Sequence, residues 1–77
     1  MNRYTVKVKI DGISACNVRV QAADVATAST MAREIVHAMQ TERAARVAAS
    51  GGPAWAAQAP AFSAVVVTGV RKIGAAA

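Results

Sequence analysis

The chain has very few of the residues on which small proteins often depend for extra stability. Its 77 residues include one cysteine, Cys16, and one histidine, His37. A disulfide within the chain is therefore excluded, and one cysteine with one distant histidine lacks the spacing of a metal site. We expect neither a metal nor a cofactor. Because a chain this short forms a thin core, a second subunit is the remaining source of additional burial.

Long apolar runs are also missing. The longest compact run covers residues 64–67, which is far short of the roughly 18 residues of a membrane span. The first residues alternate between polar and apolar, unlike the continuous apolar segment of a signal peptide. A lone thiol is typical of a reducing compartment. We therefore expect a cytoplasmic protein with a single domain over residues 1–77 and no membrane partner.

Recognisable catalytic patterns are absent as well. Gly51 and Gly52 are followed by Pro-Ala-Trp, without the Lys-Ser or Lys-Thr of a phosphate-binding loop. The four acidic residues are expected at a turn, a helix cap and a helix surface, where they do not converge for acid–base chemistry. Cys16 is expected on the core side of a strand, and His37 is expected to face solvent. We expect a protein that is not an enzyme and has no small-molecule substrate.

Two alternating runs predict a hairpin over about residues 3–21, with the turn signal Asp11-Gly12 between them. A two-residue turn would pair Val6 with Asn17 and so bring a polar side chain into the core. A connection of odd length pairs Val6 with Val18 instead. We therefore predict an odd-length connection with Gly12 in a left-handed conformation.

A helix is predicted over about residues 24–42, with Asp24 as its N-cap. An extension to residue 50 is left open, because Glu42 and Arg46 form a favourable pair one turn apart. The glycines that follow end the helix. Apolar residues at helical spacing form the predicted core stripe, namely Val25, Ala28, Met31, Ala32, Ile35, Val36 and Met39.

The remaining chain predicts an Ala/Gly/Pro-rich connection over about residues 43–61 and a third strand over about residues 62–73. A short helical turn is expected at residues 53–58. Three consecutive valines indicate a strand buried on both sides. The fold class is therefore α+β, a ββαβ domain. Its three-stranded, mostly antiparallel sheet has one helix on one face, and the strand order 2-1-3 is favoured over 1-2-3.

Charge is unevenly distributed in this chain. Nine Lys and Arg residues oppose four Asp and Glu, which gives a net charge of +5 and favours an acidic partner. The outer face of the hairpin is predicted to carry basic residues and no acidic ones, and Arg71 and Lys72 follow at the far end of the third strand. The candidate contacts for phosphate or an acidic partner are Arg3, Lys7, Lys9 and Arg19.

Two interpretations of this pattern stay open. Basic residues on exposed strands contact polyanions, but they also prevent strands from aggregating edge to edge. Aromatic side chains for stacking on bases are missing from the predicted basic face, so contact with phosphates is the version of nucleic-acid binding that remains.

A second candidate surface is apolar. Val65, Val67 and Trp55 are expected to form a dimer or partner interface, unless residues 43–61 cover the valines within the chain. The leading functional hypothesis is a small non-enzymatic binding module of regulator or inhibitor type. It would act through protein–protein contacts, as a homodimer. The alternative is a nucleic-acid-binding protein that is indifferent to base sequence and uses the basic hairpin face.

Overall fold

The chain begins with a β-hairpin. The structure, a computed structural model, describes residues 1–10 and 14–75. Strands β1 (Asn2–Ile10) and β2 (Ser14–Ala22) pair antiparallel, with Val6 opposite Val18. The predicted odd-length hairpin is therefore confirmed. The left-handed conformation predicted for Gly12 lies outside the described residues.

Helix α1 (Val25–Ala49) follows the hairpin. The side chain of Asp24 accepts a hydrogen bond of 2.7 Å from the backbone N–H of Thr27, as expected for an N-cap. The helix runs through the extension that the sequence left open. It ends at Ala49, and Gly51, just beyond the C-cap, has a φ of 74°, a left-handed conformation that glycine adopts without steric cost.

The segment between α1 and the last strand is mostly irregular. The N–H of Ala57 donates to the carbonyl oxygen of Pro53 at 3.1 Å, so the helical turn predicted here is only a hydrogen-bonded turn. A 3₁₀ turn, η1 (Phe62–Ala64), then leads into strand β3 (Val65–Ala75). The third strand therefore begins three residues later than predicted, because residues 62–64 form η1.

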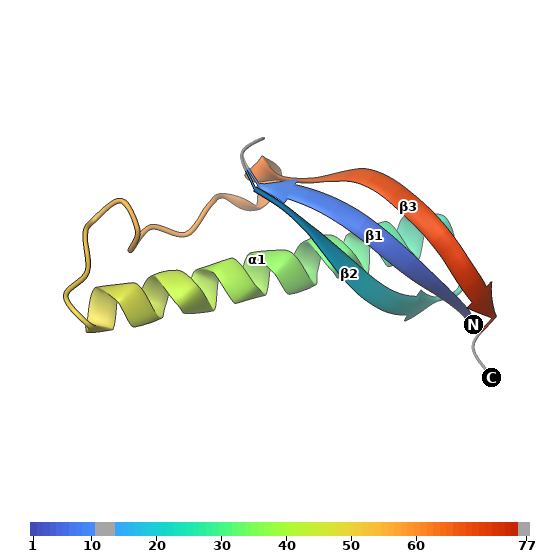
Figure 1. The fold of residues 1–77 in the computed structure, drawn as a ribbon, viewed down its shortest axis with the longest axis horizontal. Coiled ribbons are helices and arrows are strands. Elements are labelled where there is room, and N and C mark those ends of the chain that lie inside the picture. The colour runs from blue at the N-terminus through green and yellow to red at the C-terminus, as the bar shows by residue number, and fades with distance from the viewer. Residues whose placement is uncertain (11–13, 76–77) are drawn as a thin grey trace.

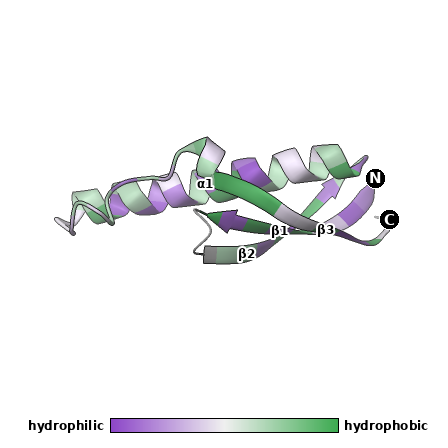
Figure 2. Ribbon diagram, turned by 90° about the horizontal axis from the view of Figure 1, so that it is seen from above, coloured by the Kyte–Doolittle hydropathy of each residue, from purple (hydrophilic) through white to green (hydrophobic). Residues whose placement is uncertain are grey.

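The three strands form one antiparallel sheet in the order β2-β1-β3, which confirms the favoured topology and the α+β fold class. The helix and the sheet form two layers, and no other element among residues 1–10 and 14–75 covers the far side of the sheet (Figures 1 and 2). At a rise of about 1.5 Å per residue, α1 is about 37 Å long. Its C-terminal half projects past the sheet, with the irregular segment alongside it (Figure 1).

Strand β3 corrects the prediction of two-sided burial. Val65 is fully buried on the helix side and Val67 is half-buried there, whereas Val66 is 51% exposed on the other side. The register against β1 then shifts between Val67 and Gly69, which leaves Thr68 as the extra residue of a β-bulge. Because their burial alternates, the three valines show the pattern of an ordinary strand with one buried side.

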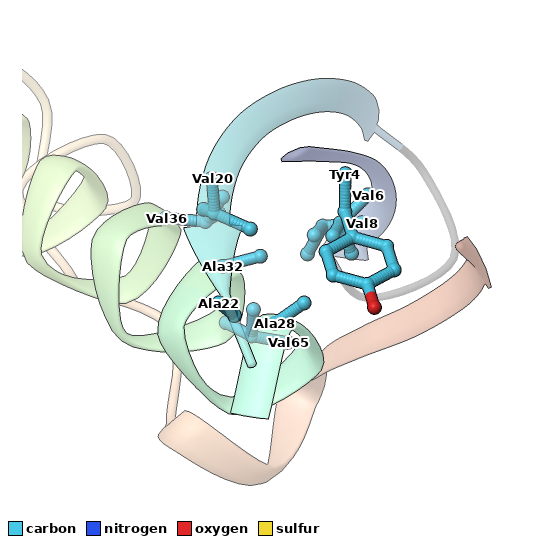
Figure 3. Close-up of a cluster of buried hydrophobic side chains, with 9 residues drawn as sticks. All are labelled: Tyr4, Val6, Val8, Val20, Ala22, Ala28, Ala32, Val36 and Val65. Carbon is cyan, nitrogen blue, oxygen red and sulfur yellow. The ribbon is translucent and has the colours of Figure 1, made fainter. Parts of the chain in front are cut away.

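The core lies between the sheet and the first half of α1. Figure 3 shows side chains from all three strands and the helix meeting there. The helix contributes mainly small residues, and three members of its predicted core stripe are exposed: Val25 by 53%, Ile35 by 40% and Met39 by 58%. The buried cluster consists of Tyr4, Val6, Val8, Val20, Ala22, Ala28, Ala32, Val36 and Val65.

Candidate functional site

The side of the sheet turned away from α1, which we call the open face, carries basic residues from each of the three strands. Tyr4, Val6 and Val8 point to the helix, so the residues that alternate with them on β1 point to the open face. The pairing of the strands extends this assignment to β2 and β3. The exposed cations of the open face are Arg3, Lys7, Lys9, Arg19 and Arg71.

The strand register places these cations close together. Arg19 and Arg71 lie on either side of Thr5, which is their partner on the central strand. Because neighbouring strands are about 4.8 Å apart, the backbones of the two arginines are about 10 Å apart. Along β1, Lys7 and Lys9 are separated by two residues, or about 6.8 Å. All four sequence-predicted basic residues are therefore on one surface, and Arg71 joins them.

The described acidic residues are elsewhere in the molecule. Asp24 caps α1, and Glu34 and Glu42 lie on α1 itself. Within the described part of the chain, the open face therefore carries charge of one sign. Like charges on adjacent strands repel one another, so this arrangement lowers the stability of the sheet unless anions compensate it.

Arg71 and Lys72 are separated by the pleat of β3. Arg71 pairs with Thr5 and points to the open face, whereas Lys72 pairs with Tyr4 and follows the helix side. From the sequence, both residues were expected at the far end of the strand, with nothing to assign them to different sides. The bulge at Thr68 shifts the alternation of β3 by one residue, and this shift decides which of the two cations lies on the open face.

The open face is hollowed in two places. A shallow depression of about 370 Å³ lies at its centre, between Lys7, Arg71 and Gly69. A second depression, of about 260 Å³, lies toward the end of β2 and is lined in part by Arg3, Arg19 and the exposed Ile73. Basic side chains border both depressions.

The predicted apolar interface is not assembled as expected. Val65 belongs to the core and is fully buried within the single chain, and Val67 packs against the core from a half-buried position. Val65 is therefore not available as a surface contact. Trp55 is 80% exposed and borders a separate depression that contains neither valine and is lined by Ile10, Gln40, Arg43, Trp55, Gln58, Ala59 and Pro60.

A cluster that the sequence did not reveal joins α1 to η1. The guanidinium carbon of Arg33 lies 4.2 Å from the centre of the Phe62 ring, and its Nη2 donates to the Phe62 carbonyl at 3.1 Å. The ring of His37 meets the same phenyl ring edge-on at 5.4 Å. His37 is half-buried by this contact rather than facing solvent, because the late start of β3 brings Phe62 onto the helix.

The histidine, cysteine and acidic side chains of the described residues are dispersed over the molecule. Among residues 1–10 and 14–75, no three His, Cys, Asp or Glu side chains are grouped as metal ligands would be. Cys16 packs against the core cluster, as predicted. No helix in the same described segments is both long enough and apolar enough to cross a membrane.

No family model, curated protein or solved structure matches this chain.

Proposed function

We propose that this protein is a non-enzymatic binding protein whose open face contacts the phosphate backbone of nucleic acid. The observation that carries the proposal is the position of five cations on one uncovered sheet surface: Arg3, Lys7, Lys9, Arg19 and Arg71. A ligand with closely spaced negative charges offsets the repulsion among these side chains. It also releases the counterions that each phosphate holds.

The proposed contact is with the backbone rather than with bases. None of the three aromatic residues lies on the open face: Tyr4 is buried, Phe62 packs on α1, and Trp55 is in the irregular segment. Proteins that bind single strands use exposed aromatic side chains as stacking platforms. This face lacks such platforms, so duplex nucleic acid, bound without regard to base sequence, is the favoured ligand.

The test is a fluorescence anisotropy titration of labelled duplex and single-stranded DNA at several salt concentrations. Five phosphate contacts predict a log–log slope of affinity against salt of about −4.5 for duplex DNA, at about −0.9 per contact. Binding is expected to be similar for unrelated duplex sequences and weaker for single strands. No duplex binding at low salt would remove this proposal.

Charge reversal on the two sides of the molecule provides the control. The double variant Lys7→Glu with Lys9→Glu is expected to abolish duplex binding and to leave the fold intact, because both side chains are exposed. The matched variant Arg43→Glu with Arg46→Glu changes the net charge equally on exposed positions of α1. It is expected to retain most of the binding. Equal losses in both variants would indicate an effect of net charge alone.

Self-association through protein contacts is a second candidate function, and it is favoured by the exposure of Trp55. A tryptophan that is 80% exposed is unusual on a small protein, and tryptophan is enriched among interface anchors. Val66, 51% exposed on the free edge strand β3, is the second apolar contact of this proposal. Size-exclusion with light scattering is expected to show a dimer that Trp55→Ala or Val66→Lys dissociates. A wild-type mass of one chain would eliminate this candidate.

A further inference from the structure

The central depression of the open face is surrounded by hydrogen-bond donors from all three strands. We call it the Gly69 notch and define it by Thr5, Lys7, Asn17, Gly69 and Arg71, which line it together with Val70. Two of these residues carry positive charge, and two others offer a hydroxyl and an amide N–H. Lys7 is paired with Asn17 on one side and with Gly69 on the other. The donors therefore surround the space that is left open because Gly69 has no side chain.

The fold does not require a glycine at this position. The glycines with positive φ in the described chain are Gly51 and Gly74, so Gly69 has a backbone conformation open to other residues. A Cβ atom added to Gly69 would meet no heavy atom within 4 Å. A glycine inside a strand weakens the strand and often marks the close approach of a ligand. The neighbouring bulge at Thr68 does not explain it, because the bulge type that needs glycine places it in a left-handed conformation.

We infer that the Gly69 notch holds one phosphate group of the bound nucleic-acid backbone, an inference that rests on the function proposed above. Phosphate oxygens accept charge-assisted hydrogen bonds from arginine and lysine. The neutral donors of Thr5 and Asn17 complete the contacts that a backbone phosphate makes in protein complexes. The missing side chain at Gly69 lets the phosphate approach the sheet between these groups. Arg3 and Lys9 then act at the margins of the interface.

The deciding variant is Gly69→Val, which fills the notch without changing any charge. Its affinity for duplex DNA is expected to fall about tenfold, the effect of losing hydrogen bonds to one charged group. The salt slope is expected to be smaller in magnitude than that of the wild type by about 0.9, because one phosphate contact is lost. Its resistance to urea is expected to be equal or higher, since a β-branched residue suits a strand.

The matched control is Ala15→Val. Ala15 is exposed, pairs with Lys9 on the open face and lies outside the notch. The substitution places a valine on the same face, and the affinity and salt slope of this variant are expected to equal those of the wild type. If Gly69→Val does not fold, Asn17→Val provides a second neutral variant that removes a donor from the notch, with the same expected loss.

The outcomes separate this inference from the function on which it rests. Wild-type binding with an unchanged affinity and slope in Gly69→Val overturns the notch and leaves nucleic-acid binding in place. No wild-type binding at low salt overturns both. Inorganic phosphate, titrated at constant ionic strength, is expected not to displace the duplex, because a free phosphate lacks the other backbone contacts. Displacement by small amounts of phosphate would overturn the assignment to a backbone phosphate.

Discussion

The Nε of Arg33 donates a hydrogen bond of 2.7 Å to the carbonyl oxygen of Val65, the residue at which β3 begins. Arg33 is in the first half of α1, so this bond ties the helix to the edge strand of the sheet. The same side chain stacks over Phe62 in η1. One side chain therefore holds the start of β3 against the helix, at the point where the irregular segment rejoins the sheet.

Replacing Arg33 is expected to destabilise the fold although the residue is charged and only half-buried. Arg33→Met retains the aliphatic stem but leaves the Val65 and Phe62 carbonyls without this donor, at a cost of roughly 1–3 kcal/mol. Arg33→Lys is expected to retain little of this stability, because an ammonium group lacks the planar fork of N–H donors with which the guanidinium group reaches both carbonyls. Urea unfolding measures the effect. Arg43→Met on the exposed part of α1 is the control, expected within about 0.5 kcal/mol of the wild type.

The two neighbours Ile35 and Val36 are expected to differ sharply in their contributions to stability. Val36 is 1% exposed in the core, so Val36→Ala should cost about 2 kcal/mol from lost burial and the cavity left behind. Ile35 is 40% exposed, and Ile35→Ala should cost under about 1 kcal/mol, because alanine also favours the helix. Denaturant unfolding of both variants checks this order. A larger loss for Ile35 would show that α1 docks on a different face.

The pleat of β3 predicts unequal roles for its adjacent cations. Arg71→Gln removes a charge from the open face and should weaken duplex binding for all base sequences, with a salt slope about 0.9 smaller in magnitude. Lys72→Gln removes the same charge from the helix side and should change the slope much less. Anisotropy titrations at several salt concentrations compare the two variants. Equal slopes would mean that Arg71 and Lys72 do not lie on opposite sides of the sheet in the way that the bulge at Thr68 implies.

The N-cap of α1 predicts a dependence of stability on acid. The hydrogen bond from the Thr27 backbone N–H lowers the pKa of Asp24 from its ordinary value of 3.8. A carboxyl group with a lower pKa in the folded state stabilises the fold above 3.8, and this contribution is lost as the pH falls through the folded-state pKa. Asp24→Asn keeps a capping oxygen but does not titrate. The difference in melting temperature between wild type and Asp24→Asn should shrink as the pH falls below 3.8 and through the folded-state pKa of Asp24. A difference that stays constant over this acidification would contradict the prediction.

The hairpin was predictable because strand alternation and pairing parity constrain each other. Only an odd-length connection brings Val6 opposite Val18 and Tyr4 opposite Val20, and the structure has both pairs. The same parity placed Lys7 and Arg19 on the outer face. Most of the candidate site therefore followed from the alternating pattern of two strands.

The helix contacts were harder to predict from apolar character. Ala28 and Ala32 are fully buried whereas Met39 is 58% exposed, because small side chains let the helix approach the sheet and a three-stranded sheet covers only part of the apolar stripe. On β3, the alternation of polar and apolar residues does not locate the bulge at Thr68. Without the bulge, neither the side on which Arg71 lies nor the notch beside Lys7 can be derived.

The order of strands has a consequence for how the protein is made. β1 is the central strand, but its second partner, β3, is the last element of the sheet to be synthesised. Until residues 65–75 emerge from the ribosome, the hairpin and helix expose one unpaired edge of β1, with Val6 and Val8 only partly covered. Such an edge is a template for pairing with other chains. Pairing between segments so distant in the chain is also slow, so the docking of β3 is the step that ends the exposure of the nascent chain to aggregation.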